Sequence, residues 1–396
     1  MRQKTGVSTG FLVFCATMVL TVGRPAAQEP QGPGNGAKPV LSLTIRCDET
    51  EWKVGDEVAV TFVIKNEGKS LYEYSDRNYD RSGRMGEYKL SATDANGKAM
   101  PDPRAKRRVS RGGGLAGIGE LVPGKSFAKT IALNRWALLT QAGTYRVVGT
   151  YHCEGKWPAI TSQPIEITLG PRTEQEMGAH VERLCARLAT VRDPLRAALV
   201  RKLMYTCDRR AIPALLDAMQ RADAASYWAG EAFNHYLPKT PEVDRALLAA
   251  AATRGLARGM FQVLKQRGVT REQITPVIDV SLSPDHPAAW GEGVLAAQQY
   301  ADDRFTPRLI AIATDLKSPA RRAAIFALAV NRTDESVATL KKLLQEPDPP
   351  KPIRQTIRQT TEFAIRTAYL YRGNAEGRRL RKDDFDAKYQ TPPGAQ

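Results

Sequence analysis

Two different spacings of apolar residues divide this chain. Between residues 41 and 169, apolar and polar residues alternate in short runs, whereas from about residue 174 the apolar residues recur every three or four positions. Alternation puts apolar side chains on one face of a β-strand, and the wider spacing puts them on one face of an α-helix. The pattern predicts a strand-rich N-terminal region followed by a helical region.

Six alternating runs predict the strands of the first region, with turn signals such as Asn96-Gly97 between them. This number of short strands suits an all-β sandwich. Ala142–Val147 resembles the Gly-x-Tyr turn into a late strand of immunoglobulin-like domains, and Val147 stands where antibody domains carry cysteine. The resemblance implies an immunoglobulin-like β-sandwich over residues 38–171. The runs are Leu41–Ile45, Val58–Ile64, Tyr88–Ala92, Phe127–Leu133, Tyr145–Tyr151 and Ile165–Leu169.

A helical unit that starts at a proline recurs in the second half, at Pro194, Pro287 and Pro319. Residues 193–198 align with residues 318–323 without a gap. Each segment offers an N-cap side chain followed by proline at the first helical position, where the missing amide costs nothing. Each copy predicts two helices joined by a turn.

A period near 31 residues runs through this region. Pro194 and Pro287 are 93 residues apart, and weaker copies fit near Ala225 and Leu256. A two-helix unit this short cannot bury its apolar face alone, so neighbouring units are expected to stack.

The strongest copy carries a resemblance to a known repeat. Arg321–Leu328, read Arg-Arg-Ala-Ala-Ile-Phe-Ala-Leu, and the following Asp334–Leu344 resemble the short HEAT-like repeat of the phycobilisome-lyase type. The resemblance covers about residues 192–372 and implies a HEAT-like α-helical solenoid. We expect the helical domain to span residues 172–390, followed by a disordered tail at 391–396. An irregular helical bundle without true repeats is the alternative.

The N-terminus has the pattern of a secretory signal peptide. Basic residues precede an apolar stretch, Phe11–Val22, and small residues follow, so we expect a signal peptide over 1–27, cleaved after Gly23 or Ala27. Residues 28–37 are rich in Pro and Gly and are expected to form a flexible linker. The apolar stretch is shorter than the roughly 20 residues that span a bilayer, so no transmembrane span is expected after cleavage. The sequence predicts export to the periplasm or the cell exterior.

The chain is basic, with a net charge of +16. Removal of residues 1–27 takes away three basic residues and no acid, which leaves +13. After export, the expected partners are proteins or acidic polymers of the cell envelope and not nucleic acid. The densest basic run is a candidate anion-binding loop, with a solvated linker as the alternative; its residues are Arg104, Lys106, Arg107, Arg108 and Arg111.

Four cysteines remain after cleavage, in a compartment that permits disulfides. Cys47 and Cys153 share strand parity with apolar neighbours, so both are expected to point inward and to form a bridge. Buried free thiols are the alternative. Whether Cys185 and Cys207 are free stays open.

Two glycine-rich segments match the sequence patterns of nucleotide-binding loops. Gly119–Ser126 matches G-x4-G-K-S, but an alternating strand follows it where the phosphate-binding motif needs a helix. Gly112–Gly117 matches G-x-G-x-x-G without a βαβ context. No motif of a catalytic or metal site is evident, and the sequence predicts neither nucleotide, cofactor nor metal.

The leading hypothesis is a non-catalytic exported scaffold or binding protein that uses a groove of the helical repeats to bind an envelope protein or polymer. Candidate groove residues are aromatic, with a core role as the alternative. One competing hypothesis is an enzyme or enzyme accessory related to helical-repeat lyases. Another is adhesion to polyanions or a cell surface through the basic loop. The groove candidates are Tyr227, Trp228, Phe233, Tyr236 and Trp290.

Overall fold

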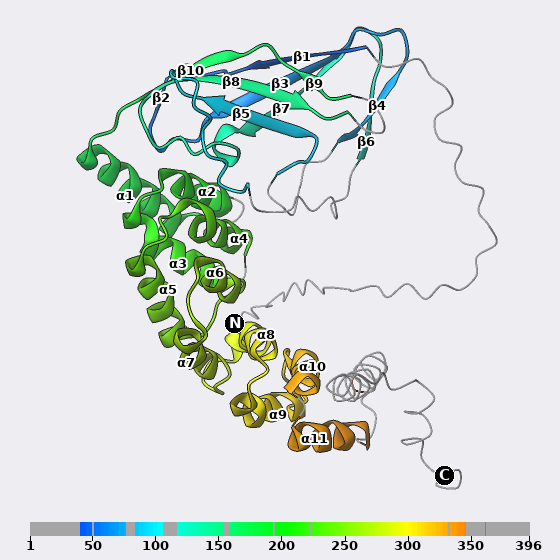
Figure 1. The fold of residues 1–396 in the computed structure, drawn as a ribbon, viewed down its shortest axis with the longest axis vertical. Coiled ribbons are helices and arrows are strands. Elements are labelled where there is room, and N and C mark those ends of the chain that lie inside the picture. The colour runs from blue at the N-terminus through cyan, green and yellow to red at the C-terminus, as the bar shows by residue number, and fades with distance from the viewer. Residues whose placement is uncertain are drawn as a thin grey trace, which may run out of the picture.

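The computed structural model places a strand-rich region before a helical one, as the apolar spacing predicts (Figure 1). It describes residues 40–345 and residue 361, with gaps at 50, 77–83, 106–116, 154–157, 193–194, 222 and 332. The expected signal peptide, linker and C-terminal tail therefore lie outside the described residues. No helix among the described residues has the length and apolar content to cross a membrane.

The strands form three sheets, with the orders β1-β3-β7, β2-β10-β8-β5 with β9 beside β8, and β4-β6. All six predicted strands are present, as β1, β3, β5, β7, β8 and β10. The bounds are β1 Leu41–Arg46, β2 Trp52–Lys53, β3 Ala59–Asn66, β4 Tyr72–Asp76, β5 Tyr88–Thr93, β6 Gly117–Leu121, β7 Ser126–Ala132, β8 Gly143–Tyr151, β9 Ile160–Thr161 and β10 Ile165–Gly170.

The first two sheets share one apolar core. Phe62 and Ile64 of β3 and Val147 of β8 are fully buried in it. Gly149 of β8 lets the sheets approach closely, because a Cβ atom there would lie 2.6 Å from Ile45 Cγ2 of β1.

The helices follow as consecutive pairs that match the five predicted units. α2–α3, α8–α9 and α10–α11 correspond to the three proline-started copies, and α4–α5 and α6–α7 to the weaker ones. The bounds are α1 Glu174–Thr190, α2 Leu195–Thr206, α3 Ile212–Gln220, α4 Ala224–Glu231, α5 Pro241–Arg254, α6 Met260–Arg267, α7 Arg271–Ser281, α8 Trp290–Tyr300, α9 Thr306–Thr314, α10 Arg321–Asn331 and α11 Asp334–Gln345.

The helices stack in two rows. α2 packs on α4 and α8 on α10, while α3 packs on α5 and α5 on α7 (Figure 1). One apolar core runs between the rows from Val181 to Leu343 and also includes Ala132 of β7.

The two best-matched copies share a helix-capping arginine. Arg196 donates to the Leu188 carbonyl at 2.8 Å, and Arg321 donates to the Ala313 carbonyl at 2.8 Å. Both side chains are buried and sit two residues after the proline of their copy. Each therefore satisfies a carbonyl at the end of the preceding helix, which has no partner within that helix.

The expected bridge between Cys47 and Cys153 is not present, since all four described cysteines are free thiols. Cys47 follows the last residue of β1, and Cys153 lies two residues beyond the end of β8. Strand alternation, on which the expectation depended, no longer fixes the direction of side chains beyond the strand ends. Cys185 and Cys207 are half-buried thiols in the helical region.

Candidate binding site at the junction of the strands and helices

A buried ion pair joins the strand-rich region to the helices. Arg104 Nη2 lies 2.5 Å from Glu231 Oε2 and also donates to the Tyr227 hydroxyl at 3.1 Å. Arg104 follows β5 in the chain, and Glu231 ends α4. Both charged side chains are almost fully buried. Removing Glu231 would leave Arg104 as an uncompensated buried charge.

Arg84 organises the strand side of this junction. Its guanidinium donates to the Asp102 carboxylate at 3.0 Å and to the backbone carbonyl of Arg135 at 2.9 Å. It also lies over the Trp136 ring, 4.2 Å from the centroid. Asp102 in turn accepts from the Arg104 amide at 2.8 Å, so the same carboxylate fixes the loop that delivers Arg104.

A second group of contacts ties the first helices to the turn before β3. Arg172 donates to Asp56 at 2.8 Å, and the Tyr236 hydroxyl donates to the Asn134 carbonyl at 3.1 Å. The Asn134 side chain accepts from the Val58 amide at 2.7 Å. These hydrogen bonds therefore hold together the turn before β3, the segment after β7 and the first helices.

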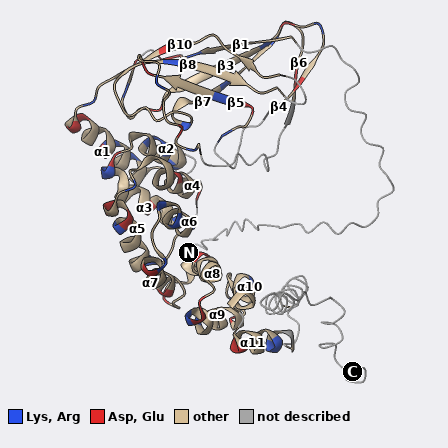
Figure 2. Cartoon of the chain, in the orientation of Figure 1, with Lys and Arg blue, Asp and Glu red and all other residues tan. Residues whose placement is uncertain are grey.

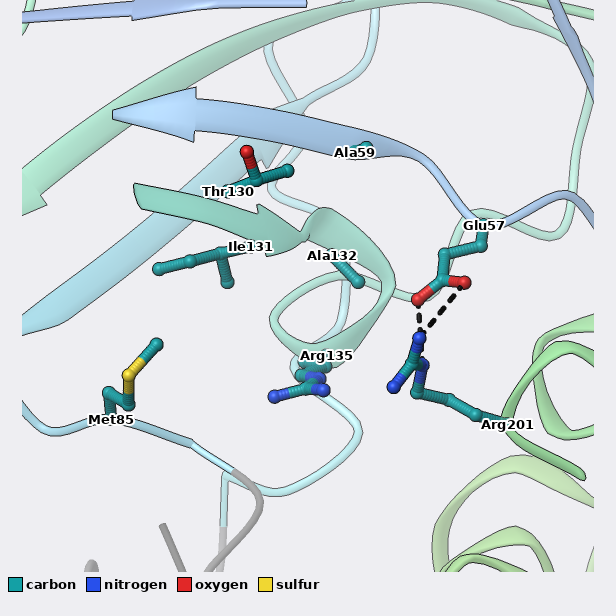
Figure 3. A pocket seen from close by; sticks show the side chains of 8 residues that line it. All are labelled: Glu57, Ala59, Met85, Thr130, Ile131, Ala132, Arg135 and Arg201. Atoms are coloured by element: carbon teal, nitrogen blue, oxygen red, sulfur yellow. Dashed lines mark hydrogen bonds and ion pairs between the residues drawn. The ribbon is translucent and has the colours of Figure 1, made fainter. Parts of the chain in front are cut away.

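A pocket of about 330 Å³ opens beside these contacts (Figure 3). Arg201 of α2 closes one side with two hydrogen bonds to Glu57, at 2.7 and 3.4 Å. In Figure 3 the Arg135 guanidinium lies between this pair and Met85. The lining residues are Glu57, Ala59, Met85, Thr130, Ile131, Ala132, Arg135 and Arg201.

Trp228 of α4 supports both arginines of the pocket. The Arg135 guanidinium lies 5.0 Å and the Arg201 guanidinium 5.7 Å from the centroid of its ring. Cation–π contacts of this kind hold a guanidinium plane without using its hydrogen-bond donors. Tyr227 packs edge-on against the same ring, at 5.1 Å.

Several ionisable groups lie in or near the pocket. Arginine stays charged in proteins, so neither Arg135 nor Arg201 can act as an acid or base. The charges of both arginines act on Tyr205 of α2, and burial raises the pKa of its hydroxyl to about 12. Burial, with the nearby Arg172 charge, also lowers the pKa of His180 below its ordinary value.

Of the residues in the predicted anion-binding loop, Arg104 lies within the described part of the chain. Arg104 is buried against Glu231, so its charge is already neutralised. Lys106, Arg107, Arg108 and Arg111 lie outside the described residues. The prediction that Arg104 binds an anion is therefore wrong, because Glu231 already pairs with it. The sequence could not show this pairing, since Glu231 lies on a distant helix.

The predicted groove aromatics have three different roles. Phe233 and Tyr236 are buried in the helical core, so they do not line a groove. Tyr227 and Trp228 are half-buried at the junction, where they contact the arginines described above. Trp290 begins α8, and its indole nitrogen donates to the Ser283 carbonyl at 2.9 Å.

Sequence reasoning missed the charged residues of the pocket. Glu57, Arg135 and Arg201 stand in no motif and are far apart in the chain. The only local signal was Trp228, an aromatic residue on a short helix. Among the described residues, no group of three or more His, Cys, Asp or Glu side chains could hold a metal ion.

Comparison with known proteins gives one family match. Residues 320–346, which contain α10 and α11, match the model of the PBS lyase HEAT-like repeat. This confirms a HEAT-like repeat where the sequence resembles one most strongly. No curated protein matches the sequence.

One solved structure with some likeness is the native conformation of E. coli alpha-2-macroglobulin. It is 10% identical, with a TM-score of 0.18, and the match covers 83% of this chain and 22% of that chain. The matched part thus spans about a fifth of that protein's length. A TM-score this low supports no argument about fold or function.

Proposed function

We propose that this protein is a non-catalytic, exported binding protein. In this proposal the strand-rich region is an immunoglobulin-like β-sandwich and the helices form a HEAT-like solenoid. The sandwich positions one end of the solenoid, and the solenoid binds a protein or an acidic polymer of the cell envelope. The observation that carries the proposal is the pair of helix rows around one unbroken apolar core. Stacked helix pairs create extended surfaces that other repeat proteins use for binding.

The distribution of charge favours the row of helices that contains α8 and α10 as the binding face. Figure 2 shows Lys, Arg, Asp and Glu mixed along the row that contains α5 and α7, while α8 and α10 of the other row are mostly uncharged. Leu295 of α8 is 38% exposed, although it is a large apolar residue. Leu295 is therefore the residue at which we test whether α8 contacts a partner.

The N-terminal pattern of the sequence supports the proposal of export. A basic start, a short apolar stretch and small residues at Gly23 and Ala27 favour a cleaved signal peptide. An export test is simple: the mature protein recovered from the cell envelope should begin after one of these two residues.

The binding proposal is tested by capture of partners from envelope extract with the full mature chain. Leu295→Arg should abolish capture of the proteins or polymers that the unchanged chain retains. Leu316→Arg is the matched control, because Leu316 is 71% exposed in the loop between α9 and α10. Equal capture by the Leu295→Arg variant and the unchanged chain would contradict α8 as the binding face. No retained partner at all would contradict the function.

A further inference from the structure

A histidine lies where α1 meets the strand-rich region. His180 Nε2 of α1 is 3.9 Å from Asp56 Oδ1, in the turn before β3. The same oxygen lies 2.8 Å from Arg172 Nη2, so the histidine and the arginine share one carboxylate oxygen. We propose that protonation of His180 loosens the contact between α1 and the strand-rich region, which makes the joint sensitive to acid. The inference does not depend on the proposed function, since neither α8 nor a signal peptide takes part in it.

The shared carboxylate is already satisfied while His180 is neutral. Asp56 Oδ1 accepts from Arg172, and Asp56 Oδ2 accepts from the Lys53 amide at 2.8 Å. Arg172 also donates to the Val54 carbonyl at 2.7 Å, which fixes its guanidinium beside the turn. The His180 side chain is only 16% exposed. A proton added here would create a charge with little water around it, beside a carboxylate that another cation already holds.

The charges that act on His180 are mostly positive. Arg172, Arg183 of α1 and Lys202 of α2 all disfavour its protonation, whereas Asp56 favours it. Burial, followed by the charge of Arg172, lowers the pKa of His180 below its ordinary value. Geometry and charge therefore both favour the neutral imidazole in the closed joint.

Two other carboxylates on this side of the joint are paired with cations of their own. Glu176, one turn before His180 on α1, lies 3.1 Å from Lys53 Nζ. Glu57, which follows Asp56, lies 2.7 Å from Arg201 Nε. Neither carboxylate can turn toward a protonated imidazole without losing its present partner.

The lowered pKa fixes the direction of the pH effect. When α1 separates from the strands, His180 becomes hydrated and its pKa returns to about 6.5, the value of an unperturbed histidine. The opened joint therefore binds a proton more readily than the closed joint does. The free energy that holds α1 in place is fully present above about pH 6.5 and decreases as the pH falls below that value. This range lies above the ordinary pKa values of aspartate and glutamate, which are about 4.

The main experiment measures hydrogen exchange of the α1 amides in the full mature chain at pH 7 and at about pH 5.5. After correction for the intrinsic exchange rate at each pH, protection of α1 should fall about threefold or more at the lower pH. His180→Gln keeps a polar side chain of similar length that cannot be protonated. This variant should retain most of its α1 protection at the lower pH.

A charge reversal on the neighbouring helix tests the same idea without changing the histidine. Lys202 is exposed on α2, so Lys202→Glu should not disturb packing. The new carboxylate should favour protonated His180 and reduce the loss of α1 protection in acid. Lys342→Glu is the matched control, because Lys342 is an exposed lysine on α11, far from the joint (Figure 1). This control should lose as much α1 protection as the unchanged chain.

A titration of the histidine itself completes the test. The chain has four histidines, so the ¹³C-histidine NMR signal of His180 can be assigned with His180→Gln. Its midpoint should lie below about pH 6.5, and a midpoint at or above this value would overturn the proposal. Equal α1 protection at both pH values in the unchanged chain would also overturn it. An undiminished acid loss in His180→Gln would do the same and would direct attention to His235, which lies 3.9 Å from Glu231.

Discussion

At the scale of single residues, burial changes the chemistry of Cys47. Burial, together with the negative charge of Asp48, raises the pKa of this thiol to about 11. The thiolate is the reactive form, so at pH 9 only about one thiol in a hundred is reactive, whereas an ordinary cysteine is largely ionised. The rate of alkylation of Cys47 in the native protein should therefore rise about tenfold per pH unit up to pH 10.

Alkylation of Cys47 is measured by peptide-resolved mass spectrometry after short exposure to iodoacetamide. The same cysteine in urea-unfolded protein is the control, and its rate should level off near pH 9. A native rate that also levels off there would contradict the effect of burial. Complete resistance to alkylation without a reductant would instead show that Cys47 is disulfide-bonded in solution.

Residue roles that depend on distant partners could not be predicted. The basic run around Arg104 is visible in the sequence, but the carboxylate that neutralises Arg104 is Glu231, on a helix of the other region. Likewise, Arg201 and Glu57 are 144 residues apart. The sequence shows the sign of each side chain's charge, whereas the fold determines which charges pair.

At the scale of elements, a close approach between two helices depends on a glycine. A Cβ atom on Gly293 of α8 would lie 2.8 Å from Ser281 Cβ and 3.3 Å from Leu282 Cδ2, at the end of α7. Gly293→Ala should therefore push α7 and α8 apart and lower the free energy of unfolding by about 1–3 kcal/mol, the usual cost of overpacking.

Gly291→Ala is the matched control on the same helix, because a Cβ atom at Gly291 meets nothing within 4 Å. Alanine has the higher helix propensity, so this variant should raise the free energy of unfolding by about 0.5–1 kcal/mol. Urea titration of both variants measures the two changes. Stabilisation by both alanines would mean that α8 can move away from α7 at no cost.

Strands and helices whose apolar residues recur at a clear period could be predicted from the sequence, and those without such a period could not. The long alternating runs gave β3 and β8, and the helical spacing gave all five helix pairs. β6 was missed because its two glycines are typical of loops. In the structure, Gly119 pairs with Tyr74 of β4, and a Cβ atom at Gly119 would overlap the tyrosine ring. This glycine therefore makes room for an aromatic residue on the neighbouring strand.

At the scale of the whole molecule, buried ion pairs join the two regions. Arg104 and Glu231 bring opposite charges together where neither is exposed to water. Arg172 pairs with Asp56 and Arg201 with Glu57, so further ion pairs join the regions. A buried charge without its partner is unfavourable, so separation of the regions would require these pairs to be broken together. The regions should therefore move together and unfold together.

This coupling gives a prediction for the unfolding of the full chain. Glu231→Ala leaves Arg104 buried without its partner charge, which should cost about 3–5 kcal/mol. We expect the unchanged chain to unfold in a single calorimetric transition. Because the cost of the substitution arises at the joint, the variant should instead show two transitions, one for each region. Arg104→Met combined with Glu231→Leu removes both charges and keeps apolar volume, so it should recover most of the stability and the single transition.

The exposed pair of Asp217 and Arg221 provides the matched control for the joint. Both side chains are more than half exposed, and such pairs contribute at most about 1 kcal/mol, so Asp217→Ala should leave the calorimetric profile nearly unchanged. Both Glu231→Ala and Asp217→Ala remove a carboxylate from an arginine. A difference between their calorimetric profiles is therefore caused by the burial of the pair. Two transitions already present in the unchanged chain would show that the buried pair does not couple the regions. A Glu231→Ala profile identical to that of the unchanged chain would show that water reaches Arg104 in solution.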